Sequence, residues 1–289
     1  QIFYRYTDKV EPLSLDEAYL DVTDCTECQG SATLIAQKIR ADIAAEVGVT
    51  ASAGIAPNKF LAKVASDLNK PDGQYVITPD AVEEFVEKLE VKRIFGVGKV
   101  TNEKLRRLGI ITCGDLQQRS LIELVDKFGV FGKRLHDLSF GRDNREVNSN
   151  SRRKSLSVEH TYSDDLKDQA ACLKKIPELL LELRSRLRRV DSDYLVTKQF
   201  IKMKFNDFTA TTVERQMVSG LPIESFEVLC REAWERGMDR AESKDKSENI
   251  NSSEQGENGR GKPVRLLGIG VRFVDTSEQG RAMQLELFP

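Results

Sequence analysis

The order of elements in the second half of the chain limits the fold more than any other feature. A strand is expected over residues 156–162, where apolar and polar side chains alternate, followed by a long helix with apolar residues three and four apart from Leu173 to Val190. Two strands follow over residues 198–208 and 210–218, then a helix around residues 226–234 and a strand over residues 264–274. The order βαββαβ predicts a ferredoxin-like split unit.

The first of the two middle strands predicts a sheet with two unlike faces. The residues that point to one face are Ile201, Met203 and Phe205. Those that point to the other face are Lys198, Lys202 and Lys204. One face of the sheet can therefore build a core while the opposite face meets phosphates. The polar segment 242–262, between the last helix and the last strand, predicts a disordered loop.

The first 78 residues predict a small α/β layer. A helix with apolar residues at helical spacing covers residues 31–47 and stops at Gly48. Short strands within residues 49–56 and 74–77 flank a helix over residues 58–68. Strands that alternate with helices indicate an α/β layer, and residues 11–22 are expected to supply another of its strands.

Two carboxylates, Asp16 and Glu17, stand side by side in EPLSLDEAYLDV, a run in which Leu13 and Leu15 are expected to pack. In a regular strand, neighbouring side chains point to opposite faces, so both can serve one site only at the tip of a hairpin. We therefore expect residues 12–15 to enter the tip and residues 18–22 to leave it. Two carboxylates held close repel each other, and a divalent cation such as Mg²⁺ relieves that repulsion. A solvated hairpin tip is the alternative.

Charge divides the chain, although its total is only −2. Residues 1–89 carry a net charge of −7, from 8 Lys and Arg against 15 Asp and Glu, whereas residues 90–154 carry +7, from 15 against 8. An acidic catalytic region followed by a basic region that lies on a polyanion would give this division. Solvated helices alone would give it too.

Glycines precede a lysine and a helical pattern twice in the basic region, in IFGVGKVTNEKLRRLGI at residues 94–110 and in FGVFGKRLHDLSFG at residues 128–141. The backbone N–H groups at the start of such a helix bind phosphate without reading sequence, which is the principle of a helix-hairpin-helix. Two ordinary helical hairpins capped by glycine are the alternative. The polar segment that follows gathers Arg152, Arg153 and Lys154 and predicts a basic linker able to follow a nucleic-acid backbone.

The last six residues, QLELFP, predict a contact with another surface. Three large apolar side chains near a chain end need either the protein's own core or another protein that takes up a short peptide. Five cysteines at irregular spacing indicate reduced thiols in the cytosol, and Cys25 and Cys28 lack the second pair of ligands that a zinc site needs. The sequence has no apolar run of membrane-spanning length and no signal peptide.

Several of these stretches together resemble one family. The segments PLSLDEAYLDVT, SAGIAPNKFLAKVASDLNKPDGQYVI, IFGVGKVTNEKLRRLGI and QLELF are similar to those of the bacterial DinB-type (DNA polymerase IV) family of Y-family translesion DNA polymerases. The resemblance covers essentially the whole chain, in order. It implies an α+β multidomain fold with a partial α/β palm over 1–78, an all-α helix-hairpin-helix thumb over 79–146, a basic linker over 147–154, a ferredoxin-like little finger over 155–275 and a clamp-binding tail over 276–289.

The resemblance also implies roles for individual residues. It makes Asp16 a ligand of Mg²⁺, Glu17 the adjacent catalytic carboxylate at a site for two Mg²⁺ ions, and Lys70 a contact of the triphosphate of the incoming dNTP. It places Gly96, Gly98 and Lys99 on the backbone of primer–template DNA. The residues that match the peptide bound by the sliding clamp are Gln284, Leu285, Leu287 and Phe288. Such a protein is expected to be a cytoplasmic monomer.

The chain departs from the family pattern in two places. Family members begin with a strand that carries another metal-binding Asp and an aromatic gate, followed by the fingers, and nothing of this precedes Gln1. We therefore expect a truncated chain that does not polymerise alone. Phe95 stands where the thumb hairpin commonly has proline. Two alternatives are a non-catalytic module that binds DNA and the clamp, and a helix-hairpin-helix repair nuclease, which leaves the βαββαβ region unexplained.

Overall fold

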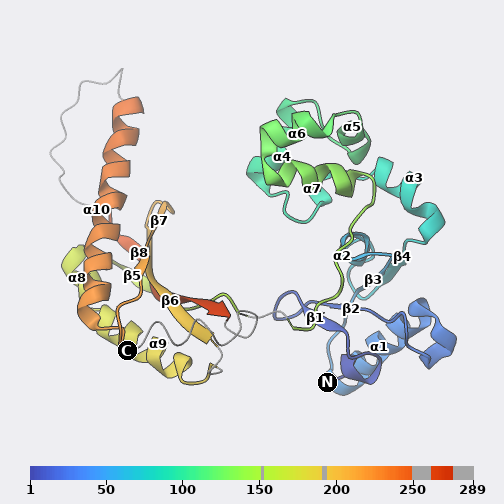
Figure 1. Cartoon of the computed structure of the whole chain (residues 1–289), viewed down its shortest axis with the longest axis horizontal. Coiled ribbons are helices and arrows are strands. Elements are labelled where there is room, and N and C mark those ends of the chain that lie inside the picture. The colour runs from blue at the N-terminus through green and yellow to red at the C-terminus, as the bar shows by residue number, and fades with distance from the viewer. Residues whose placement is uncertain (151–152, 191–193, 249–261, 276–289) are drawn as a thin grey trace, which may run out of the picture. The chain divides into compact units, whose positions relative to one another are not determined.

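The computed structural model describes residues 1–150, 153–190, 194–248 and 262–275 of the chain. The chain divides into two compact units, Gln1–Ser151 (unit 1) and Arg152–Pro289 (unit 2) (Figure 1). Among the helices in the described ranges, none is both long and apolar enough to cross a membrane.

Unit 1 begins with an antiparallel hairpin followed by a small α/β segment. The elements in order are η1 (Phe3–Arg5), β1 (Val10–Pro12), β2 (Ala18–Leu20), η2 (Glu27–Gly30), α1 (Ala32–Val47), β3 (Ala53–Ile55), α2 (Lys59–Ser66) and β4 (Gln74–Val76). The side chain of Ser31 caps the start of α1, and Gly48 ends the helix with a φ of 73°. The predicted helices and short strands are therefore confirmed.

The strands of unit 1 do not form the single layer that the sequence led us to expect. In the described part of the chain, β1 pairs with β2 and β3 pairs in parallel with β4, which gives two separate sheets. The difference lies in the backbone pairing: within the described residues the three-residue strands β1 and β2 bond to each other, and β3 bonds to β4. On its apolar side the hairpin packs through Leu20 on a small core of Tyr6, Ile35 and Ile39.

The second half of unit 1 is built of helices, with one isolated β-bridge between Glu90 and Thr112 in the described part of the chain. Its elements are η3 (Pro79–Ala81), α3 (Val82–Glu87), η4 (Val91–Arg93), α4 (Lys99–Arg107), α5 (Cys113–Gln117), α6 (Leu121–Phe128) and α7 (Val130–Ser139). Figure 1 shows α4 to α7 gathered at the end of the unit opposite α1. Phe60 and Leu61 of α2 share one buried core with Leu105 and Leu135 of these helices. The expected boundary after residue 78 therefore crosses a continuous core, and the division into palm and thumb stays a prediction.

The second glycine motif differs from its prediction. Helix α7 begins at Val130, directly after Gly129 at a φ of 60°, so Gly132 and Lys133 lie inside the helix rather than before it. A Cβ atom at Gly132 would lie 2.0 Å from the carbonyl oxygen of Leu124 in α6. Gly132 is thus a close-packing position between two helices and not a turn.

A buried ion pair fastens the start of the linker to unit 1. The Nζ atom of Lys59, whose side chain is 9% exposed, pairs with Glu11 of β1 and donates to the carbonyl of Glu146 at 3.1 Å. The same Glu11 carboxylate accepts a hydrogen bond from the backbone N–H of Asn148 at 2.6 Å. Burial opposes ionisation of Glu11, but the Asn148 N–H and Lys59 outweigh it and lower its pKa. The first residues of the predicted linker over 147–154 are therefore held against unit 1.

Lys59→Met is expected to destabilise unit 1 by about 2 kcal/mol, because it leaves the Glu11 carboxylate largely buried without its cation. Urea unfolding of the full-length protein measures the loss. Lys88→Met is the matched control, since Lys88 pairs with Glu84 on the exposed side of α3 and that pair is open to solvent. We expect no measurable change from the control, and an equal effect of the two substitutions would contradict the anchoring role.

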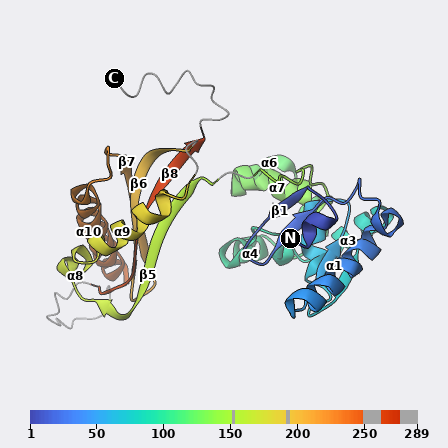
Figure 2. The same ribbon diagram turned by 90° about the horizontal axis from the view of Figure 1, so that it is seen from below.

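Unit 2 is one antiparallel sheet with its helices on one face (Figure 2). Its elements are β5 (Ser155–Leu166), α8 (Gln169–Leu173), α9 (Ile176–Leu187), β6 (Tyr194–Phe205), β7 (Ala210–Gln216), α10 (Ile223–Glu248) and β8 (Val264–Asp275). The strand order is β5-β8-β6-β7, and each neighbouring pair is antiparallel. Strands β5 and β6 therefore run parallel with β8 between them, which confirms the predicted split βαβ unit.

Two local expectations for unit 2 need correction. The predicted long helix is two helices, because Pro177 falls in the first turn of α9, where its missing N–H leaves no hydrogen bond unmade. The polar segment expected to be a loop from residue 242 is helical up to Glu248, in keeping with its content of Glu and Lys, which favour helix. Residues 249–261 lie outside the described part.

The two faces of β6 are arranged as predicted. Ile201, Met203 and Phe205 are buried in the core between the sheet and its helices. Lys198, Lys202 and Lys204 are partly exposed, at alternate positions to that core.

Candidate active site

The hairpin between β1 and β2 carries the two predicted catalytic carboxylates at its tip. The backbone N–H groups of Leu13 and Ser14 donate to the carbonyl of Glu17 at 2.8 and 3.2 Å, which closes the tip. The expected hairpin is confirmed, with β1 ending at Pro12. Leu15, which we expected to pack, is instead fully exposed, because a five-residue tip has no sheet beneath it.

The two carboxylates have different partners. One oxygen of exposed Asp16 accepts a hydrogen bond from the Ser14 hydroxyl at 2.7 Å, and Glu17 Oε1 accepts one from Lys63 Nζ at 2.9 Å. Within the described ranges, the second oxygen of each carboxylate has no protein partner. Two carboxylates with open oxygens fit Mg²⁺, which takes one or two of them together with substrate phosphates. No cluster of three metal-binding side chains occurs among the residues whose placement is described.

Helix α2 continues the charged network away from Glu17. Lys63 Nζ lies 3.6 Å from Asp67, and Asp67 lies 2.6 Å from the Nζ atom of Lys70, the predicted triphosphate contact. Partial burial disfavours the charged form of Lys63, but the hydrogen bond to Glu17 and the charge of Asp67 raise its pKa. Burial likewise opposes ionisation of Asp67, whereas the hydrogen bond from Lys70 and the charge of Lys63 lower its pKa.

Glu17 and the first glycine turn border the same pocket. The residues that line it are Glu17, Lys63, Val64, Asp67, Lys92, Arg93, Ile94, Phe95, Gly96 and Val97. These residues come from the hairpin tip, from α2 and the residue that follows it, and from η4 and the turn after it. The structure therefore brings a predicted metal ligand and a predicted DNA-contacting turn to one cavity, although they are far apart in the sequence.

The glycine turn leads into the start of α4, which no side chain caps. Gly96 has a φ of 102°, which disfavours other residues, and a Cβ atom there would come 3.3 Å from the ring of Phe131. Gly98 is the N-cap of α4, which begins at Lys99 as predicted, and no side chain caps it. The N–H groups of the first turn of α4 are thus available to an anion. Phe95, in the place of the family's proline, is about half exposed (47%).

The outer face of the unit 2 sheet carries paired cations. Lys202 lies 2.8 Å from Glu159, and Lys198 lies 2.8 Å from Glu214, which Arg272 also contacts. Lys204 Nζ lies 4.7 Å from the centre of the Phe208 ring.

The predicted linker and tail are described only in part. The backbone N–H of Arg153 donates to the Tyr194 hydroxyl at 2.9 Å, and the carbonyl of Lys154 accepts from Phe273 N at 2.9 Å. Both residues therefore join the sheet of unit 2. Arg152 lies outside the described residues, as do the predicted clamp-binding residues Gln284, Leu285, Leu287 and Phe288.

Sequence reasoning missed Lys63 and Arg272. Lys63 is four residues before Asp67 and seven before Lys70, a spacing that places all three on one side of α2 and the turn that follows it. Arg272 lies two residues after Gly270 and four after Gly268, so it shares their face of β8. The predicted strand over 264–274 was therefore enough to place it on the outer face.

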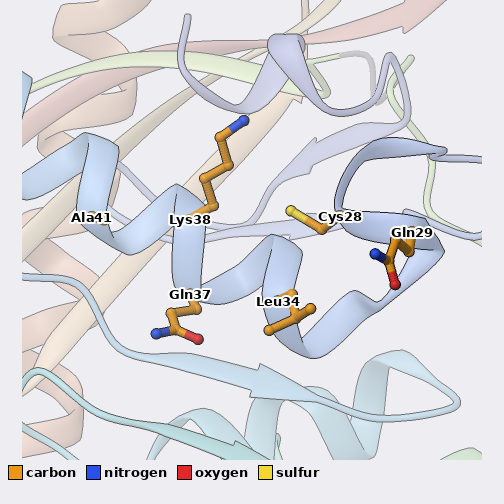
Figure 3. A pocket seen from close by; sticks show the side chains of 6 residues that line it. All are labelled: Cys28, Gln29, Leu34, Gln37, Lys38 and Ala41. Atoms are coloured by element: carbon orange, nitrogen blue, oxygen red, sulfur yellow. The ribbon is translucent and has the colours of Figure 1, made fainter.

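A second hollow lies beside the CTEC segment. Figure 3 shows Cys28 directed toward α1, from which Leu34, Gln37, Lys38 and Ala41 line the hollow. Lys38 lies 3.5 Å from Glu27. The hollow gathers no set of groups that indicates a ligand.

Models of known families match three parts of the chain. The model described as impB/mucB/samB family matches residues 1–67, and that of its C-terminal domain matches residues 153–287. A model described as DNA polymerase-iota, thumb domain, matches residues 92–143, which include the glycine turn and α4 to α7.

Similar proteins and structures agree with these matches. A DNA polymerase IV of Ectopseudomonas mendocina is 52% identical over 287 residues, which cover 99% of this chain and 74% of the relative, and that of Pseudomonas syringae pv. tomato is 51% identical with the same coverage. The structure of a Y-family DNA polymerase chimera, Dbh-Dpo4(243-245)-Dbh, has a TM-score of 0.74 at 25% identity and covers 94% of this chain and 72% of that one. An insertion ternary complex of Dbh DNA polymerase shares the fold, with a TM-score of 0.57, 24% identity and coverage of 95% and 73%. With a relative more than half identical over nearly the whole chain, this chain belongs to the bacterial DNA polymerase IV (DinB) family of Y-family, DNA-directed DNA polymerases.

Proposed function

We propose that the protein copies damaged template DNA by transferring a nucleotide from a dNTP to the 3′-hydroxyl of a primer. The observation that carries the proposal is the pocket shared by Glu17 and the Gly96 turn, since a polymerase needs its carboxylates beside a surface that holds the DNA backbone. The 52% sequence identity to a DNA polymerase IV also supports the proposal.

Asp16 and Glu17 are the residues proposed to hold two Mg²⁺ ions. When bound, such ions stabilise the charge on the attacking and leaving oxygens of a phosphoryl transfer. Lys70, exposed in the segment that follows α2 and paired with Asp67, is proposed to bind the triphosphate of the dNTP. The residues proposed to contact DNA are Gly96, Gly98, Lys99, Arg152, Arg153, Lys154, Lys202 and Lys204.

The test is extension of a labelled primer on a template with and without a damaged base, by the full-length protein. Template-directed extension past the lesion supports the proposal. The second candidate is a non-catalytic module that binds DNA and the clamp. It is favoured by one observation: the described residues place no third acidic side chain at the hairpin tip. DNA binding without any extension would select it.

DNA affinity is expected to fall steeply with added salt, because phosphate contacts release counterions. If Lys202 and Lys204 each neutralise a phosphate, the double substitution to Gln should make the negative slope of log affinity against log salt shallower by about 2. Fluorescence anisotropy at several salt concentrations measures the slope. Lys167→Gln, at an exposed lysine between β5 and α8, is the control. An unchanged slope in the double variant would remove the two lysines from the DNA surface.

We further propose that the tail binds the sliding clamp and that the protein acts in the cytoplasm as a monomer. Deletion of residues 284–289 is expected to remove stimulation of primer extension by the clamp, because an apolar peptide supplies the anchors of such a contact. Primer extension without the clamp should stay unchanged. Equal loss of both activities would instead indicate that the tail packs on the protein's own core.

A further inference from the structure

A row of alternating charges links Glu17, the proposed metal ligand, to Lys70, the proposed triphosphate contact. Glu17 Oε1 lies 2.9 Å from Lys63 Nζ, at the end where the metal ions would bind. Lys63 lies 3.6 Å from Asp67, which in turn lies 2.6 Å from Lys70, at the end where the triphosphate would bind. Two side chains, those of Lys63 and Asp67, thus connect the Glu17 carboxylate to Lys70.

Lys63 differs from an ordinary surface lysine in three respects. Its side chain is only 17% exposed, it contacts two carboxylates, and it lies in the pocket that Glu17 shares with the Gly96 turn. Its helix is anchored, because Phe60, Leu61 and Val64 of α2 are buried in the core of unit 1. Lys63 therefore connects Glu17, at the hairpin tip, to a helix that is fixed in the core.

We propose that Lys63 and Asp67 are positioning residues that set Glu17 and Lys70 at a fixed separation. Lys63 occupies one oxygen of the Glu17 carboxylate and would leave the other to a bound cation, as a hydrogen-bonded partner orients a metal ligand. Asp67 contacts Lys63 and Lys70 at once, so the proposed metal ligand and the proposed triphosphate contact share one support. This inference rests on the proposed function.

The experiment compares Lys63→Gln, Lys63→Arg and Asp67→Asn in the full-length protein. Lys63→Gln is expected to lower kcat of primer extension about 10- to 100-fold, the usual cost of losing the partner of a metal ligand. KM for the dNTP should change by less than about threefold, because the triphosphate contact stays in place. Lys63→Arg keeps both ion pairs and should recover most of kcat, whereas Asp67→Asn should raise KM and lower kcat.

A second readout does not depend on turnover. Mn²⁺ binding is measured by electron paramagnetic resonance in the complex with a dNTP and a primer that lacks its 3′-hydroxyl. We expect Lys63→Gln to weaken Mn²⁺ binding about tenfold. Lys88→Gln, which breaks an exposed pair of the same i,i+4 spacing in α3, should change nothing.

Three outcomes would overturn the inference. Tighter Mn²⁺ binding by Lys63→Gln would make Lys63 a competitor of the cation rather than its support. Equal loss of kcat in the Gln and Arg variants, together with a lower unfolding temperature, would make its role structural. Wild-type kcat in Lys63→Gln would remove the role altogether. Absence of primer extension by the wild-type protein is a separate result, which overturns the proposed function itself.

Discussion

Glu17→Gln is expected to lower kcat of primer extension by the full-length protein about 10³-fold, the size of effect seen when a preorganised electrostatic contact to the reacting group is lost. The substitution keeps the shape of the side chain and removes the charge that would attract a cation. Asp16→Asn should act similarly, because its carboxylate stands at the same tip with one oxygen open. Single-turnover kinetics with saturating dNTP measures the chemical step.

DNA binding separates this loss from misfolding. Both carboxylates lie at the tip of a hairpin and outside the buried cores. The amide in Glu17→Gln would keep an acceptor oxygen for Lys63, which Asp67 still neutralises, so neither variant should change the unfolding temperature or the affinity for primer–template DNA. Glu27→Gln removes a carboxylate of unit 1 that lies away from the pocket and should leave extension intact. Extension within about tenfold of wild type in Glu17→Gln would contradict the catalytic assignment.

Local patterns in the sequence predicted most elements correctly, because their causes are local. The hairpin tip at Asp16, the Ser31 and Gly48 ends of α1, and the start of α4 after Gly98 each depend on neighbouring residues. The faces of β6 follow from its period of two. The break before α9 was also readable, since Pro177 favours the first turn of a helix.

The remaining features depend on contacts between distant residues. Glu11 meets Lys59 and Asn148 across 48 and 137 positions, and no pattern in one sequence links them. The separation of the hairpin from β3 depends on which strand edges pair, and periodicity does not show that. Lys63 reads as a polar position on an amphipathic helix until the hairpin tip is placed beside it.

Gly132 is a further residue whose role depends on a contact with another helix, and its substitution is expected to have a large effect on stability. In sequence it looks like a turn residue, but its backbone does not need glycine, since its conformation is that of α7. What needs glycine is space: a Cβ atom would lie 2.0 Å from Leu124 O and 2.7 Å from Val125 N, both backbone atoms that no side-chain rotation can move. Gly132→Ala must therefore push α7 away from α6.

The expected cost of Gly132→Ala is about 3 kcal/mol or more in the free energy of unfolding, at the upper end for an overpacked core. Because Leu124 and Leu135 belong to the core that also holds Phe60 of α2, the loss should appear in the unfolding of unit 1 as a whole. Gly98→Ala is the matched control, since nothing lies within 4 Å of a Cβ atom there and its φ is −80°. Urea unfolding followed by tryptophan fluorescence would miss the effect, because Trp234 lies in unit 2, so circular dichroism is the measurement. A Gly132→Ala protein as stable as Gly98→Ala would mean that the two helices can separate without loss, and that the glycine has another purpose.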